Sequence, residues 1–177
     1  MGNPGYTTRE WYEKIGTFLG LNLEIEDLFL AVKRRVEKVA EVTAGKSFAL
    51  GACFSPQTFE FVRFLIEELG MEPKVIVWST EAERGQEHRE AILNRGFDPI
   101  LVHGNHFVVE PLIKEIRPDL LLGADLSFLN ESGIAWVPHT SGTGYYGFEE
   151  TMYALNAIER ALRPAGVQGG RHECCLP

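Results

Sequence analysis

The stretch Ser47-Phe48-Ala49-Leu50-Gly51-Ala52-Cys53 decides the fold, because it is a short, largely apolar run that is followed by turn-forming and helix-capping residues. A run of this length and composition is typical of a strand buried on both faces of a parallel sheet. Ser55 and Pro56 come next, and these residue types suit the N-cap and the first position of a helix. The helix they predict carries apolar residues at helical spacing, namely Phe61, Val62, Leu65, Ile66 and Leu69.

The same strand-and-helix unit recurs further along the chain. Apolar runs predict four more strands, at residues 75–79, 100–103, 120–123 and 134–137. Between and after them the pattern predicts helices at residues 83–94, 107–116, 126–130 and 148–162. Strands alternating with helices predict an α/β fold: a Rossmann-like domain whose five-stranded parallel sheet has helices on both faces. We expect right-handed crossovers and the strand order 3-2-1-4-5.

Two helices are predicted before the first strand. Thr7 and Glu10 have the spacing of a capping box, and this first helix should end near Gly20. Asn22 is the expected N-cap of the second helix. The apolar stripe predicted for that second helix consists of Leu28, Val32, Val36 and Val39.

The length of 177 residues suits one domain with short additions. We expect residues 1–45 to form a helical segment that packs on the domain. Residues 46–163 should form the Rossmann-like domain itself. Residues 164–177 are rich in glycine and end the chain, so a flexible tail is expected there.

Charge and cysteine content exclude several classes of protein. The net charge of −8 argues against a nucleic-acid groove, which needs a basic face. No apolar run approaches the roughly 18 residues of a membrane span, and the charged N-terminus does not resemble a signal peptide. The three cysteines, Cys53, Cys174 and Cys175, form no disulfide framework and no C-x-x-C motif. We therefore expect a cytoplasmic protein without nucleic-acid or membrane partners.

Candidate site residues follow the strand ends, because ligands of such sheets bind where the strand order reverses, between the first and fourth strands. Cys53 precedes a helix N-terminus, which suits a thiolate ligand, although its position alone favours a small buried residue there. Asp125 follows the fourth strand as a ligand-binding residue or an N-cap. His139 follows the fifth strand, where a metal ligand, a proton donor or a loop histidine bonded to the backbone is expected.

The segment Gly142–Gly147 matches G-x-G-x-x-G, but no further strand or acidic residue follows at the spacing that a dinucleotide needs. We therefore expect neither NAD nor FAD. Backbone N–H groups before the last helix can instead hold an acidic ligand. Together with Ser55, the residues assigned to such a ligand are Ser141, Gly142, Thr143 and Gly144. His103 and His106 are a second metal-like pair, for which turn and capping roles are the alternative.

Taken together, these segments resemble the last Rossmann-like domain of the nitrogenase component 1 family. That family includes nitrogenase catalytic subunits, cofactor-assembly scaffolds and dark-operative protochlorophyllide reductase. The resemblance runs over residues 5–163. It is carried by residues 5–8, 45–50, 61–73, 116–123, 133–139 and 144–147.

The resemblance implies a redox or cofactor-handling role, with an iron–sulfur-type metallocluster or a tetrapyrrole as the cofactor. Some family members place a histidine ligand in the loop that His139 occupies here. Cys53 is the second expected metal ligand because of its position before a helix, although its loop differs from the acidic turn of many relatives. The resemblance also implies a nitrogenase-like partner subunit or a homo-oligomer. Family subunits normally carry three such domains and N-terminal cluster cysteines, whereas we expect one such domain in these 177 residues, without the cluster cysteines.

Two other functions stay open. The chain can be a non-catalytic docking or structural module of a nitrogenase-like complex, with the helix over residues 28–39 and the aromatic residues Trp11 and Tyr12 as its interface. A nucleotide-using Rossmann-like enzyme is the third hypothesis. The sequence leaves open whether the chain is catalytic.

Overall fold

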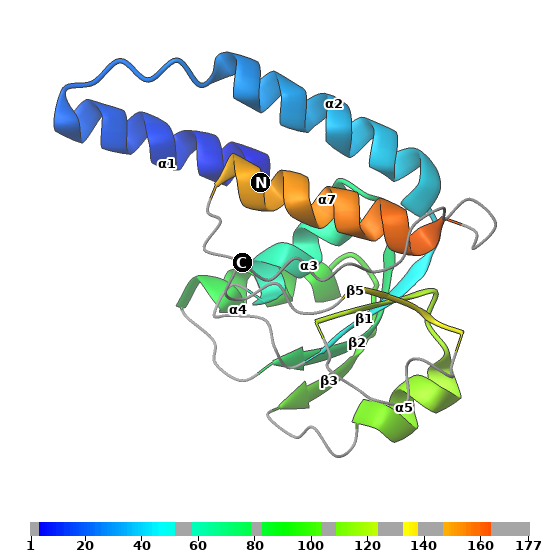
Figure 1. The fold of residues 1–177 in the computed structure, drawn as a ribbon. Coiled ribbons are helices and arrows are strands. Elements are labelled where there is room, and N and C mark those ends of the chain that lie inside the picture. The colour runs from blue at the N-terminus through cyan, green and yellow to red at the C-terminus, as the bar shows by residue number, and fades with distance from the viewer. Residues whose placement is uncertain are drawn as a thin grey trace, which may run out of the picture.

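The computed structural model describes residues 4–51, 58–78, 83–103, 109–123, 133–137 and 147–163. Figure 1 shows a central sheet with helices on both sides and a helical hairpin at the N-terminus. In chain order the elements are α1 (Pro4–Leu19), α2 (Glu26–Thr43), β1 (Ser47–Leu50), α3 (Thr58–Glu67), β2 (Glu72–Trp78), α4 (Glu83–Leu93), β3 (Ile100–His103), α5 (Val109–Ile116), β4 (Leu120–Leu122), β5 (Ala135–Val137) and α7 (Phe148–Leu162).

The sheet has five parallel strands in the order β3-β2-β1-β4-β5, which confirms the predicted fold class and strand order. The chain builds outward from β1 to β2 and β3, then crosses back to β4 on the other side of β1. The strand order therefore reverses between β1 and β4. In such folds the carboxyl ends of these two strands flank the crevice where ligands bind.

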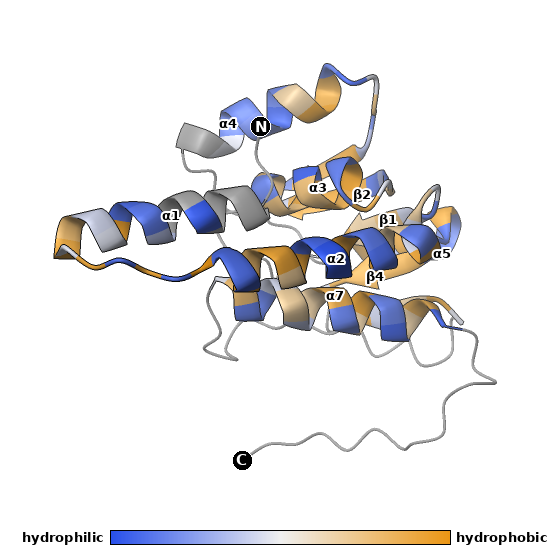
Figure 2. Ribbon diagram, turned by 90° about the horizontal axis from the view of Figure 1, so that it is seen from above, coloured by the Kyte–Doolittle hydropathy of each residue, from blue (hydrophilic) through white to orange (hydrophobic). Residues whose placement is uncertain are grey.

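Both faces of the sheet are buried, as expected for parallel strands. Phe48 and Leu50 of β1 belong to the larger core, which also includes residues of α2, α3 and α7. Ala49, between them in the sequence, belongs to a smaller core with Val109 and Ile113 of α5. Figure 2 shows hydrophobic strands between helices that mix hydrophobic and hydrophilic residues.

The start of α2 differs from the prediction. The helix begins at Glu26 after Ile25, which forms no side-chain capping bond, so the prediction of Asn22 as N-cap was wrong. Glu26 and Asp27 in the first turn favour the later start, because acidic groups stabilise the positive end of a helix.

The buried stripe of α2 differs by one residue from the predicted one. Leu28 is 55% exposed, and Phe29 is buried in its place. Phe29 meets the ring of Phe148 edge-on at 6.5 Å, a contact across the chain that helical spacing does not reveal. The remainder of the stripe is as predicted and consists of Val32, Val36 and Val39.

Several predicted features lie outside the described residues. These are the capping residues Ser55 and Pro56, the short helix at 126–130 and the tail at 164–177. Among the described elements, β3 and α7 have the predicted bounds, and α4 ends one residue earlier than predicted.

Candidate functional site at the carboxyl edge of the sheet

Three neighbouring strands end side by side at this edge. Leu50 of β1 pairs with Leu122 of β4, and Leu122 pairs with Val137 of β5. The ladder continues one residue further. The N–H of Gly51 donates to the carbonyl oxygen of Leu122 at 2.7 Å, and the N–H of Gly123 donates to that of Val137 at 2.9 Å. The three strands β1, β4 and β5 therefore end in register with one another.

The sequence-predicted site residues come directly after these three strand ends, and all of them lie outside the described residues. Cys53 and Ser55 follow β1, Asp125 follows β4, and His139 follows β5. The loop residues that complete the set are Ser141, Gly142, Thr143 and Gly144. The structure positions the strands that carry them, and their individual roles stay predictions.

The exit of the glycine-rich segment is held by α1. Gly147, the N-cap of α7, has φ +74°, and a Cβ at this position would lie 2.8 Å from Oη of Tyr12. The ring of Tyr12 stacks on Phe148 with 5.4 Å between centroids and an 8° angle between planes. Tyr12 is half-buried in this contact, which corrects its prediction as an exposed interface residue. The side chain of Trp11 lies outside the described residues.

The first turn of α7 carries its own negative charge. Glu149 and Glu150 occupy this turn, where the helix dipole favours anions. Partial desolvation raises the pKa of the Glu150 carboxyl group. An acidic ligand at this helix end would therefore compete with two carboxylates of the chain itself.

An aromatic group lies at the other half of the edge, at the ends of β2 and β3. Trp78 and His103 are paired in register, and their rings meet edge-on at 4.5 Å. Phe59 of α3 contacts the indole at 6.0 Å, and the guanidinium carbon of Arg89 lies 5.7 Å from its centroid. The only sequence signal for this group was the position of Trp78 and His103 at two strand ends. The partner proposed for His103, His106, lies outside the described residues.

The described residues do not supply a metal centre. Within the ranges that the structure describes, no three His, Cys, Asp or Glu side chains come together in a way that could hold an ion. A site with three such ligands at this edge would need at least one ligand from the residues that follow the strands, at 52–57, 79–82, 104–108, 124–132 or 138–146. In the same described ranges, no helix is long and apolar enough to cross a membrane.

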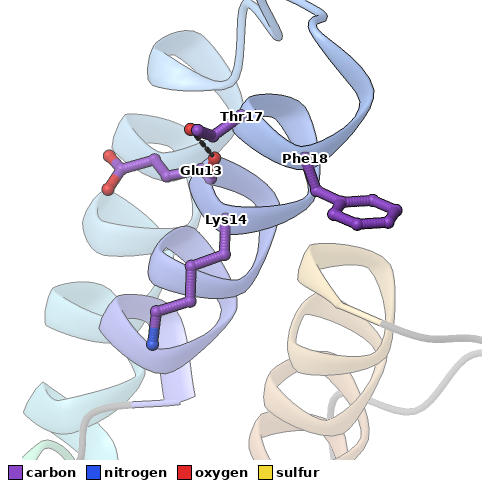
Figure 3. A pocket seen from close by; sticks show the side chains of 4 residues that line it. All are labelled: Glu13, Lys14, Thr17 and Phe18. Atoms are coloured by element: carbon purple, nitrogen blue, oxygen red, sulfur yellow. Dashed lines mark hydrogen bonds between the residues drawn. The ribbon is translucent and has the colours of Figure 1, made fainter.

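An open hollow lies on α1, away from the strand ends. Figure 3 shows its described lining, Glu13, Lys14, Thr17 and Phe18, with Phe18 pointing away from Glu13. The hydroxyl of Thr17 donates to the carbonyl oxygen of Glu13 at 2.8 Å, so it is satisfied within the helix. Phe18 is 87% exposed, and Leu19 and Leu21 beside it are more than half exposed.

The fold, with its reversal of strand order between β1 and β4, defines a Rossmann-like α/β protein. The family model for nitrogenase component 1 type oxidoreductases matches residues 6–163, so the chain belongs to that family. This confirms the family relation that the sequence motifs predicted.

A solved structure described as nitrogenase Cp1 at pH 6.5 has the same fold, with a TM-score of 0.69 and 22% identity. The match covers 88% of this chain and 37% of that one, so the present chain spans well under half of that solved chain. The search of curated proteins gave no match.

Proposed function

We propose that the chain is a nitrogenase component-1-like domain that binds a metallocofactor or tetrapyrrole-like ligand at the carboxyl edge of its sheet. It would act in reduction or in cofactor assembly, together with a partner subunit or as a homo-oligomer. The observation that carries the proposal is the common level at which β1, β4 and β5 end. Family membership supports the same class of ligand.

Chain connectivity supports the choice of residues. Cys53, Asp125 and His139 each stand two residues beyond Gly51, Gly123 and Val137, respectively. Two residues of chain reach at most about 7 Å, and adjacent strands lie about 4.8 Å apart. Two residues of chain beyond each strand are therefore long enough for the three side chains to reach one ligand. In this proposal His139 and Cys53 bind metal, and Asp125 accepts a hydrogen bond from the ligand.

The test is a UV–visible spectrum with metal analysis on protein purified without oxygen, together with its nitrogenase-like partner where one co-purifies. We expect bound iron or a tetrapyrrole absorption band. Occupancy should fall at least about tenfold in His139→Ala and in Cys53→Ala, because both variants remove a direct ligand. His103→Ala is the matched control, since His103 contacts Trp78 at the other half of the edge. Colourless, metal-free wild-type protein would refute the proposal.

A docking module is the second candidate, and the tip of the α1–α2 hairpin favours it. Phe18, Leu19, Leu21 and Leu28 expose most of their side chains there, although large exposed apolar patches are uncommon on proteins that work alone. Figure 1 shows that this tip projects beyond the sheet.

Sedimentation of the wild type and of Phe18→Glu tests the docking module. The variant should lose an oligomer or a co-purified subunit. The matched control is Leu93→Glu, which charges an exposed apolar residue of α4. A wild-type monomer without a partner would argue against this candidate.

A further inference from the structure

The inference concerns a polar contact that joins α3 to α4. Nη1 of Arg63, on α3, lies 3.0 Å from Nδ1 of His88, on α4. The same guanidinium donates twice to Oε1 of Glu67, from Nη2 at 2.8 Å and from Nε at 3.1 Å. Nη2 of Arg95, after the end of α4, lies 2.9 Å from that oxygen. The side chains of Arg63 and Glu67 are 14% and 13% exposed, so water screens this ion pair only weakly.

This geometry determines the charge of His88. A guanidinium has donors only and stays protonated, so Nδ1 must accept and the imidazole must be neutral. Protonation would place a second donor and a second positive charge 3.0 Å from Arg63. Burial lowers the pKa of His88, and the Arg63 charge lowers it further. Glu60 and Glu67 of α3 and Glu87 of α4 act in the opposite direction, but the net change is downward.

The apolar packing of α4 is sparse. The helix is mostly polar, and its buried described residues are Gly85 and Ile92. Leu93, next to Ile92, is 40% exposed. Elements with few buried apolar contacts open locally at low free-energy cost. Loss of the part-buried contact between Arg63 and His88 should therefore affect α4 before the rest of the fold.

We propose that the Arg63–His88 contact is an acid-sensitive latch, in which neutral His88 holds α4 against α3 and protonation releases the helix. Release would uncover the end of β2, because Arg89 of α4 lies over the ring of Trp78. The latch uses residues of α3 and α4 only, so it is independent of any ligand at β1, β4 and β5.

The direction and the size of the effect follow from linkage. The open form binds the proton at the ordinary histidine pKa of about 6.5, whereas the closed form resists it. Opening is therefore favoured as the pH falls below about 6.5. At pH 5.5 the opening constant can rise by at most about elevenfold, which is the protonation factor of a free histidine one unit below its pKa.

Hydrogen exchange read by mass spectrometry tests the latch in the full chain at pH 7.5 and pH 5.5, after correction for intrinsic exchange rates. Peptides covering residues 83–95 should open several-fold more often at pH 5.5, and peptides of α5 should not. His88→Gln keeps an acceptor for Arg63 and does not titrate, so α4 should stay protected at both pH values. His103→Gln is the control and should retain the pH response.

Two outcomes would overturn the proposal. The first is equal protection of α4 at both pH values in the wild type. The second is an undiminished pH response in His88→Gln. His88→Lys adds a permanent positive charge and should open α4 already at pH 7.5. The wild-type and His88→Gln comparison decides the question even where the lysine variant does not fold.

Discussion

Gly147 is under two separate constraints. Its φ of +74° disfavours any residue with a Cβ, and Tyr12 occupies the space that a Cβ would need. Gly147→Ala should therefore cost more free energy of unfolding than the roughly 1–2 kcal/mol of a left-handed alanine. Gly96→Ala is the matched control, because Gly96 has φ +83° and nothing within 4 Å of its Cβ position. Denaturant unfolding of both variants measures the difference. Equal losses of unfolding free energy in the two variants would show that the Tyr12 ring moves aside at no measurable cost.

Asp119 joins the starts of β1 and β4. Its Oδ2 accepts from the backbone N–H and the hydroxyl of Ser47, both at 2.7 Å, and these bonds lower the pKa of the Asp119 carboxyl group. A carboxyl with a lowered folded-state pKa stabilises the fold above its unfolded pKa of about 3.9, and this contribution is lost as the pH falls through the lower folded value. Asp119→Asn should cost about 1 kcal/mol at pH 7 and much less near pH 2.

Urea unfolding at the two pH values checks this dependence. Asp98→Asn is the control, because Asp98 is also exposed but has no hydrogen bond to the sheet among those of the described residues. A loss for Asp119→Asn that is equally large at both pH values would contradict the assigned charge effect.

At the scale of elements, the contact of α2 with α7 includes one buried carboxylate, that of Glu159. Glu159 is 8% exposed, and its carboxylate forms salt bridges with Arg35 of α2 and with Arg163, which lies one helical turn after it in the chain. These hydrogen bonds, the one from Arg35 first, lower the pKa of Glu159 despite its burial. Arg35 also donates to Oδ1 of Asn156 at 2.9 Å. The two helices are therefore joined by a charged group as well as by the apolar stripe of α2.

Arg35→Ala should lower the free energy of unfolding by about 2 kcal/mol, because it leaves Glu159 buried with only Arg163 as a partner. The neighbouring Arg34→Ala changes an exposed arginine of the same helix and should stay within about 0.5 kcal/mol of the wild type. Thermal or urea unfolding of both variants provides the measurement. A small effect of Arg35→Ala would mean that the apolar stripe alone holds α2.

At the scale of the whole molecule, the N-terminal helices share the core of the sheet. Phe29, Val32, Val36 and Val39 of α2 belong to the same cluster as Phe48 and Leu50 of β1. A common core predicts one cooperative unfolding transition. Val39 is fully buried. Val39→Ala should therefore lower the free energy of unfolding by about 1–3 kcal/mol, and by the same amount whether unfolding is followed by far-UV circular dichroism or by tryptophan fluorescence. Separate transitions would instead favour independent units at residues 1–45 and 46–163.

The sequence by itself determined the parallel sheet, the strand order and the family. Apolar runs, helical spacing and glycine positions are local signals, and the segments that resemble the family extend along most of the chain. Two errors, the burial of Leu28 and the exposure of Tyr12, depend on which residues meet across the chain. The caps at Asn22 and Thr7 were misplaced locally, because α2 begins at Glu26 and α1 begins at Pro4. Only the tertiary structure decided those contacts, together with the common level at which β1, β4 and β5 end and the Arg63–His88 contact. The physical reason is that periodicity shows which face of an element is apolar, whereas packing decides what covers that face.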